Sequence, residues 1–198
     1  YPTVTERLDK NPDACTVGYI GSLREMEGVD LTARAVAQLV QKGVKVQFFV
    51  LTGESGQAEL RQLCKELGIE NFSTIVGPVP HDEVATFYSL IDVFVVSRPS
   101  SRVTQLVTPL KPFEAMAMGR TVVASKLAAL EEIIQHEKTG LLYKPDDLND
   151  LADTIELCVQ QPEKRQEIGR AAQQWVLENR TWDVVVKNTK EVYNRLEI

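Results

Sequence analysis

VTPLKPFEAMAMGRTVVAS, residues 107–125, is the stretch that decides the fold of this chain. Pro112 suits the first turn of a helix, where its missing N–H would have no partner. Good helix formers follow it, and Gly119 can adopt the left-handed conformation that ends a helix. Residues 121–124 then form a β-branched apolar run, which is typical of a parallel strand buried on both faces. The stretch therefore predicts a loop, a short helix over 113–118 and a buried strand.

Strands and helices alternate on both sides of this stretch. Further apolar runs predict strands at residues 15–20, 44–51, 73–76, 93–96 and 140–143. The expected helices cover 28–42, 59–67, 82–90 with Asp82 as the cap, 130–136, 148–159, 162–178 and 182–196, and 97–105 is expected to be a polar loop. Such alternation with short links predicts an α/β fold: a Rossmann-like parallel sheet of about six strands, helices on both faces, and helices at the C-terminal end.

Composition limits the partners and the compartment. The net charge of −6 argues against a nucleic-acid partner, because phosphate backbones require a basic face. Cys15, Cys64 and Cys158 are odd in number and lack metal-ligand spacing, so we expect free thiols and no bound metal. The sequence shows no run of eighteen apolar residues and no signal peptide, so we expect a cytoplasmic protein.

Several common catalytic motifs are missing from the sequence. Gly18, Gly21 and Gly28 do not form G-x-G-x-x-G, so the dinucleotide fingerprint is absent. Neither a G-x-x-x-x-G-K-[ST] phosphate loop nor a G-x-S-x-G nucleophile motif occurs. His81 precedes a predicted helix and His136 lies in a polar turn, so both are expected to be solvated.

Ligands of open α/β sheets bind outside the carboxyl ends of the strands, where three loops are informative. Loop 77–80, GPVP, offers exposed backbone that suits edge-on recognition of a base, although a plain turn explains it equally well. Loops 21–28 and 97–111 flank the predicted helix start. In an acidic chain, four cations gather near that start: Arg98, Arg102, Lys111 and Arg120.

An anion site is the favoured reading of these cations, with a solvated loop as the alternative. Lys111 stands directly before the predicted helix, whose N-terminal amides and dipole attract negative charge. Glu114, in the first turn, could accept hydrogen bonds from sugar hydroxyls or simply complement the dipole. The combination suits a nucleotide sugar, which carries a diphosphate beside a ribose.

EAMAMGRTVVAS, at 114–125, resembles the core motif of the family 4 retaining glycosyltransferases, which have the two-domain GT-B fold. The resemblance covers the C-terminal, donor-binding half of such an enzyme. Five further stretches resemble the same family: GYIGSL at 18–23, EGVDLTARAVAQL at 27–39, FSTIVGPVPHDEVATFYSLIDVFVVSRP at 72–99, HEKTGLLYKPDDLNDLADTI at 136–155 and RTWDVVVKNTKEVY at 180–193.

The resemblance implies a domain organisation and an activity. Residues 15–180 would form the nucleotide-sugar-binding domain, 1–14 a linker from an absent N-terminal domain, and 181–198 a helix that packs on that domain. The whole enzyme would transfer a hexosyl group from a nucleoside diphosphate sugar, with retention and without a metal. A glycan or small-molecule acceptor would bind to the absent domain, which could also contact a membrane, and the present chain alone would be inactive. A role in polysaccharide biosynthesis fits this reading.

The resemblance also assigns site residues, with departures. Glu114 matches the glutamate that binds the ribose, but the position eight residues earlier, usually a second glutamate, is Leu106. The family's arginine and lysine for the diphosphate fall near Ser22 and Glu27. The TPLKP segment of a family branch stands before Glu114, so we expect Lys111 and Arg102 to be the catalytic cations. The expected donor-binding residues are Gly21, Ser22, Pro78, Val79, Gln105, Thr108, Pro109, Leu110 and Glu114.

Two alternatives stay open on the sequence alone. A sugar-nucleotide epimerase of the same fold would need acid–base residues at the sugar, and His81 and His136 are poorly placed for that. A non-catalytic nucleotide-binding protein is suggested by Ser22, Glu27 and Leu106. The sequence names neither the base, the sugar nor the acceptor.

Overall fold

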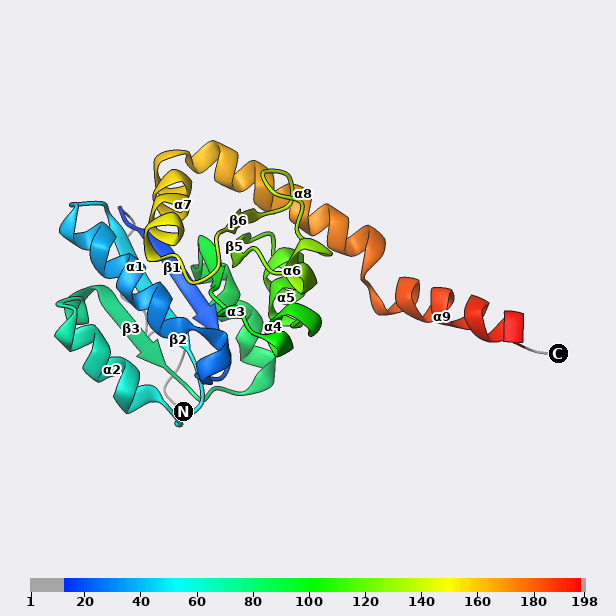
Figure 1. Cartoon of the computed structure of the whole chain (residues 1–198), viewed down its shortest axis with the longest axis horizontal. Coiled ribbons are helices and arrows are strands. Elements are labelled where there is room, and N and C mark those ends of the chain that lie inside the picture. The colour runs from blue at the N-terminus through cyan, green and yellow to red at the C-terminus, as the bar shows by residue number, and fades with distance from the viewer. Residues whose placement is uncertain (1–12, 197–198) are drawn as a thin grey trace.

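The computed structural model describes residues 13–196, which form an α/β fold around one parallel sheet (Figure 1). The sheet has six strands in the order β3-β2-β1-β4-β5-β6, and all its pairings are parallel. This confirms the predicted Rossmann-like sheet. The strands are β1 (Cys15–Ile20), β2 (Val46–Leu51), β3 (Ser73–Val76), β4 (Val93–Val96), β5 (Thr121–Ser125) and β6 (Leu141–Tyr143).

Helices alternate with the strands along the chain and pack around the sheet. Helix α1 packs against α2 and α7, whereas α5 packs against α8. The α-helices are α1 (Val29–Gln41), α2 (Gln57–Glu66), α3 (Val84–Leu90), α4 (Arg102–Leu106), α5 (Lys111–Ala117), α6 (Ala128–Glu131), α7 (Leu148–Gln160), α8 (Pro162–Asn179) and α9 (Trp182–Leu196). Three short 3-10 helices, η2 (Glu25–Glu27), η3 (Glu70–Phe72) and η4 (His81–Glu83), lie in the connections.

The central strands form the core of the molecule. Every residue of β1, β4 and β5 is buried, and Val17, Phe94 and Val123 are fully inaccessible. Burial of a large apolar side chain contributes about 1.5–3 kcal/mol, so these β-branched and aromatic runs dominate the stability. Their continuous hydrophobicity follows from burial on both faces of a parallel sheet.

The sheet order places the candidate site. The chain moves from β1 outward through β2 to β3, and then crosses back to β4 on the other side of β1. The order therefore reverses between β1 and β4, and the chain proceeds from these two strands toward opposite ends of the strand order. Such a switch point leaves a crevice outside the carboxyl ends of the two strands.

Three local predictions are corrected by the structure. The expected polar loop 97–105 contains most of α4, because Ser101 caps it in a reciprocal capping box with Thr104. Asp82 does not cap α3, which instead continues directly from η4 without a side-chain cap. The helix expected at 130–136 is the shorter α6, since the chain turns after it and the Gln135 amide donates to Thr139 Oγ1 at 2.9 Å.

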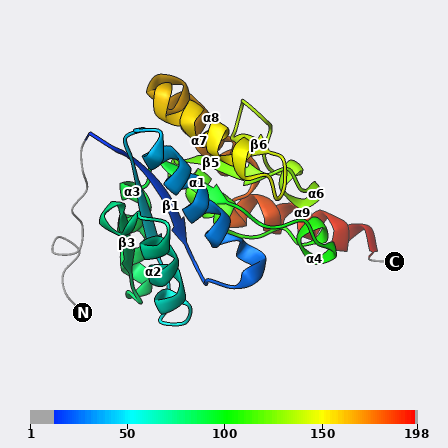
Figure 2. The ribbon, with the colours of Figure 1, turned by 60° about the vertical axis from the view of Figure 1, so that its left-hand side comes forward.

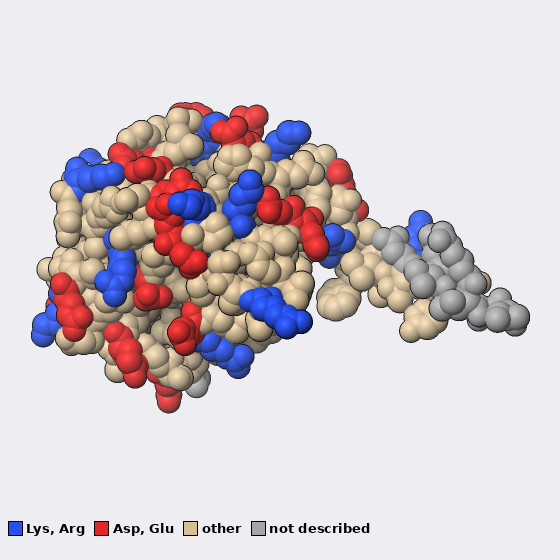
Figure 3. All heavy atoms as spheres, in the orientation of Figure 1, with Lys and Arg blue, Asp and Glu red and all other residues tan. Residues whose placement is uncertain are grey.

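The C-terminal helix α9 extends away from the body of the molecule (Figures 1 and 2). Trp182, at its start, is 81% exposed. Across the residues that the structure describes, we find no helix of sufficient length and apolarity to span a membrane. Acidic and basic side chains are interspersed on the face shown in Figure 3, without a continuous basic stripe.

Substitution of Gly28 tests how closely the loops after β1 and β4 approach each other. Its φ is 63°, and a methyl group there would come within 2.0 Å of the Ser97 carbonyl oxygen. We expect Gly28→Ala to lose roughly 1–2 kcal/mol from left-handed strain and about 1–3 kcal/mol more from overpacking. Gly43→Ala is the matched control, because Gly43 has φ 77° and no neighbouring atom within 4 Å. Equal losses of unfolding free energy in urea would contradict the close approach.

Candidate functional site

The loops after β1 and β4 are joined at the switch point of the sheet. Ser97, the first residue after β4, donates its hydroxyl to the Gly28 carbonyl oxygen at 2.6 Å and lies 2.8 Å from Thr32 Oγ1. Ser97, Gly28 and Thr32 are all buried. This junction brings the residues on either side of it, Glu27 and Arg98, into contact.

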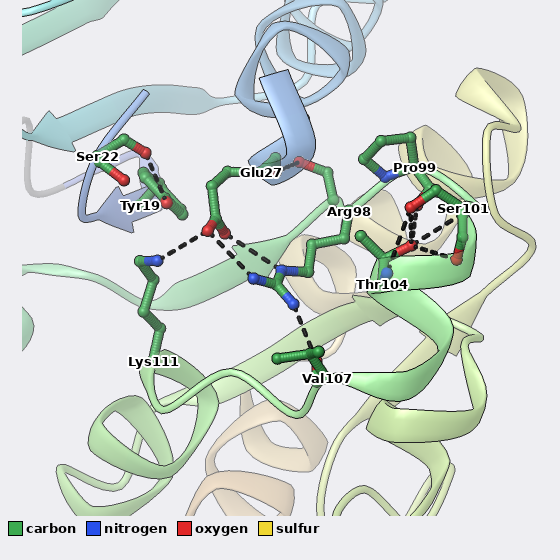
Figure 4. A network of polar contacts seen from close by, with 10 residues as sticks. Tyr19, Ser22, Glu27, Arg98, Pro99, Ser101, Thr104, Val107 and Lys111 are labelled. Carbon is green, nitrogen blue, oxygen red and sulfur yellow. Dashed lines mark hydrogen bonds and ion pairs between the residues drawn. The ribbon is translucent and has the colours of Figure 1, made fainter. Parts of the chain in front are cut away.

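Glu27 lies between two cations, Arg98 and Lys111 (Figure 4). Arg98 donates through Nη2 to Glu27 Oε1 at 3.2 Å and through Nε to Oε2 at 3.3 Å. Lys111 Nζ donates to Glu27 Oε1 at 3.1 Å. Arg98 Nη1 also donates to the Val107 carbonyl oxygen at 3.0 Å. The network therefore joins three segments: the loop after β1, the loop after β4 and the start of α5.

This network is charged and opens to solvent at one end. Burial disfavours the ionised form of Glu27, but the hydrogen bonds from Arg98 and the charge of Lys111 outweigh it, so the pKa of Glu27 is lowered. Two cations and one carboxylate leave one net positive charge. The side chains of Glu27 and Arg98 are 5% and 6% exposed, whereas Lys111 is 21% exposed. The excess positive charge is thus presented to solvent through the Lys111 ammonium.

The Lys111 side chain lies against the end of β1. Its Nζ is 5.7 Å from the centre of the Tyr19 ring. Its stem crosses Gly21, where a methyl group would come within 2.2 Å of Lys111 Cε. The Tyr19 hydroxyl donates to the Ser22 carbonyl oxygen at 3.0 Å. The structure thus brings together three residues predicted for the site, Gly21, Ser22 and Lys111.

Glu114 lies in α5, about one turn after Lys111. Its carboxylate is held by a tyrosine. The Tyr88 hydroxyl donates to Glu114 Oε2 at 2.6 Å. Burial, followed by the bond to Glu114, raises the pKa of Tyr88, so the phenol stays a donor at neutral pH. Tyr88 is 2% exposed, whereas Glu114 is exposed. A carboxylate is therefore fixed in orientation at a surface that a ligand can reach.

Two predicted residues of loop 97–111, Gln105 and Thr108, anchor it to α6. Gln105 Oε1 accepts from the Ala128 amide at 3.0 Å, and Thr108 Oγ1 donates to the Ala129 carbonyl oxygen at 3.4 Å. Pro109 is buried, while Leu110 is 72% exposed. These contacts fix the loop that leads into Lys111.

Pro78 and Val79 follow β3 at the same edge of the sheet. Gln57 donates through Nε2 to the carbonyl oxygens of Gly53 and Gly77, each at 3.0 Å. Pro78 is exposed and Val79 half-buried. The loop predicted to meet a base is thus tied to α2, on the β2–β3 side of the switch point.

The four clustered cations do not stay together in the fold. Arg120 lies at the opposite, amino edge of the sheet, where it donates to the Met118 and Ile91 carbonyl oxygens at 2.9 and 3.2 Å. The expectation that it flanks the anion site is wrong, because it precedes β5 rather than following a strand. Arg102 is exposed at the start of α4, and its side chain forms no hydrogen bond or ion pair with the residues described by the structure.

Two contacts at this edge are not expected from the sequence: the ion pair of Arg98 with Glu27 and the hydrogen bond of Tyr88 to Glu114. Arg98 is among the clustered cations of the sequence, but its pairing with Glu27 is not expected there, although its position two residues after the buried strand β4 is a signal. Tyr88 gave no signal, because its bond to Glu114 joins residues 26 positions apart in different helices.

The sequence profile described as glycosyl transferases group 1 matches residues 2–175. The chain belongs to this family. It is 26% identical to a D-inositol 3-phosphate glycosyltransferase of Corynebacterium urealyticum, over 97% of this chain and 47% of that protein. It is 27% identical to an alpha-D-kanosaminyltransferase of Streptomyces kanamyceticus, over 83% of this chain and 41% of that protein. The chain thus spans less than half the length of these two relatives.

Several solved structures share this fold. Sucrose-phosphate synthase of Thermosynechococcus elongatus matches with a TM-score of 0.79 and 26% identity, over 97% of this chain and 47% of that one. The C-terminal domain of the group 1 glycosyltransferase LpcC of Francisella tularensis matches with a TM-score of 0.72 and 20% identity, over 85% of this chain and 87% of that one. HepE of Anabaena, solved with UDP, matches with a TM-score of 0.72 and 24% identity, over 94% of this chain and 50% of that one. Together with the family match, the likeness to sucrose-phosphate synthase supports the predicted C-terminal domain of a GT-B glycosyltransferase, and the other two structures show the same fold.

The buried ion pair makes a prediction about stability. Arg98→Met leaves the Glu27 carboxylate with one cation fewer, and breaking a buried pair in this way typically costs about 3–5 kcal/mol. Arg102→Met is the matched control, because Arg102 is exposed, and we expect a change within about 0.5 kcal/mol. Unfolding in urea measures both variants. Similar losses for the two would show that the Arg98–Glu27 pair contributes little.

Proposed function

We propose that this chain is the donor-binding half of a family 4 retaining glycosyltransferase, which transfers a hexosyl group from a nucleoside diphosphate sugar. The observation that carries the proposal is the Lys111 ammonium, presented with one net positive charge at the switch point of the sheet. HepE, which shares the fold, was solved with UDP, and this supports a nucleotide donor.

The diphosphate would bind at Lys111. As the bond between the sugar and the diphosphate breaks, negative charge develops on the leaving group. A fixed cation in a partly desolvated site stabilises that charge, which is often the largest contribution to catalysis. Arg102, exposed on α4, would add a second cation from solvent when the donor is bound. Charge stabilisation by these side chains, without a resident metal, is part of this proposal.

The ribose would bind at Glu114. Its carboxylate accepts hydrogen bonds, as recognition of sugar hydroxyls requires, and the bond from Tyr88 orients it. Gly21, Ser22, Gln105, Thr108, Pro109 and Leu110 would line the donor, and Pro78 with Val79 would meet the base. The acceptor, a glycan or small molecule, would bind to a further part of the full-length protein, since the relatives are about twice as long as this chain.

Lys111→Met tests the diphosphate contact. We expect wild-type protein to bind one of UDP, GDP or ADP more tightly than its nucleoside. The variant should lose about 1.5–3 kcal/mol for the diphosphate, the usual size of a charged hydrogen bond, and little for the nucleoside. Titration calorimetry with each pair measures this. Lys42→Met is the control, because Lys42 forms an exposed pair with Glu156 between α1 and α7. Equal losses for diphosphate and nucleoside would contradict the assignment.

Glu114→Ala tests the ribose contact. We expect a loss of about 1.5–3 kcal/mol for both the nucleoside and the diphosphate, because both carry the ribose. Glu163→Ala is the control, since Glu163 is also an acid in the first turn of a helix, α8. An unchanged dissociation constant, with an unchanged melting temperature, would show that Glu114 is only an acid at a helix terminus.

The full-length protein tests the non-catalytic alternative. Donor binding without sugar transfer would favour that alternative.

A further inference from the structure

We propose that Glu27 is a positioning residue that holds the Lys111 ammonium ready for the donor, and that Arg98 holds Glu27 in turn. This inference rests on the proposed function, in which Lys111 contacts the diphosphate. It gives a role to an acidic residue at a place where a phosphate-binding site would be expected to exclude acids.

The Glu27 carboxylate is fixed on several sides. Its Oε2 accepts from Arg98 Nε, and its Oε1 accepts from both Arg98 Nη2 and Lys111 Nζ. Arg98 is fixed as well, because its Nη1 donates to the Val107 carbonyl oxygen. The carboxylate cannot rotate without breaking at least one of these bonds. Glu27 is therefore a rigid acceptor for Lys111 (Figure 4).

The backbone is shaped to receive the Lys111 side chain. Gly21 has φ 147°, and any β-carbon there would collide with Lys111 Cε. The lysine stem therefore crosses the bare backbone of Gly21, and the ammonium lies near the face of Tyr19. Glycine, aromatic ring and carboxylate together define one position for the ammonium.

A lysine fixed in advance favours an anion in two ways. Lysine has a long, flexible side chain, and ordering it before binding removes an entropic cost from the binding step. Its ammonium has three donors, so the bond to Glu27 leaves others for phosphate oxygens. In protein kinases a glutamate holds the phosphate-binding lysine in a comparable ion pair, which must be in place for activity.

A role of Glu27 as a simple counter-ion of Lys111 predicts the opposite effect on diphosphate binding. Glu27 is negative, and a pure counter-ion would compete with the diphosphate for Lys111. In that case, removal of the carboxylate charge would strengthen diphosphate binding. The two roles therefore predict changes of opposite sign for the same substitution.

A double-mutant cycle decides between them. Wild type, Glu27→Gln, Lys111→Met and the double variant are titrated with UDP, GDP and ADP and with the matching nucleosides. The readout is the ratio of the nucleoside and diphosphate dissociation constants for the base that binds best. We expect Glu27→Gln to lower this preference for the diphosphate about tenfold. In the Lys111→Met background the same substitution should change it less than twofold.

Two further variants separate position from charge and from stability. Glu27→Asp keeps the charge but withdraws the carboxylate by one methylene, so positioning predicts that this variant also loses the preference. It also serves if Glu27→Gln fails to fold, which thermal unfolding of each variant would reveal. Glu156→Gln is the matched control, because it removes the carboxylate from another lysine pair, Lys42 Nζ with Glu156 Oε2 at 3.2 Å, and should leave the preference unchanged.

The outcomes distinguish this inference from the proposed function. A preference that rises or stays constant in Glu27→Gln and Glu27→Asp, while Lys111→Met abolishes it, overturns the positioning role and leaves the proposed function standing. An equal effect of Glu27→Gln with and without Lys111 also overturns it. A wild-type protein with no preference for the diphosphate, or a Lys111→Met variant that keeps the full preference, overturns both proposals.

Discussion

A carboxylate buried between two cations is the interaction on which the functional edge of this sheet depends. Glu27, Arg98 and Lys111 come from three separate segments, and burial makes their pairing obligatory, because an unpaired charge in the interior is strongly destabilising. The pairing therefore fixes the loops after β1 and β4 and the start of α5 relative to one another. Since the network carries one net positive charge, the same contacts that order the edge also make it attractive to an anion.

The parallel sheet explains why this edge is available for function. Its central strands are buried on both faces, so they tolerate only apolar residues and carry little chemistry. The strand order reverses between β1 and β4, and ligands of open α/β sheets bind outside the carboxyl ends of the strands at such a point. Polar residues gather there because water or a ligand can satisfy them. The buried scaffold and the polar residues at its carboxyl edge thus belong to separate parts of the chain.

The positions of the cations in this chain differ from those that the family resemblance predicts. Ser22 and Glu27 stand where the family resemblance leads us to expect cations, and the sequence alone left relocation and loss of the charge as alternatives. The structure places Lys111 against both loops, with its stem across Gly21 and its ammonium on Glu27. A cation at this edge is therefore available from α5 rather than from the loop after β1.

The sequence by itself determined the strands, most helices and the fold class, because periodicity and apolar runs record each residue's burial relative to close neighbours. It also pointed to the loops at the carboxyl edge and to Lys111 and Glu114 within them. It could not show that Arg98 meets Glu27, that Tyr88 holds Glu114, or that Arg120 lies at the opposite edge. Glu27 is 71 positions from Arg98 and 84 from Lys111. Contacts over such separations depend on the order in which the strands assemble and on which charges burial forces to pair, and only the tertiary structure decides these.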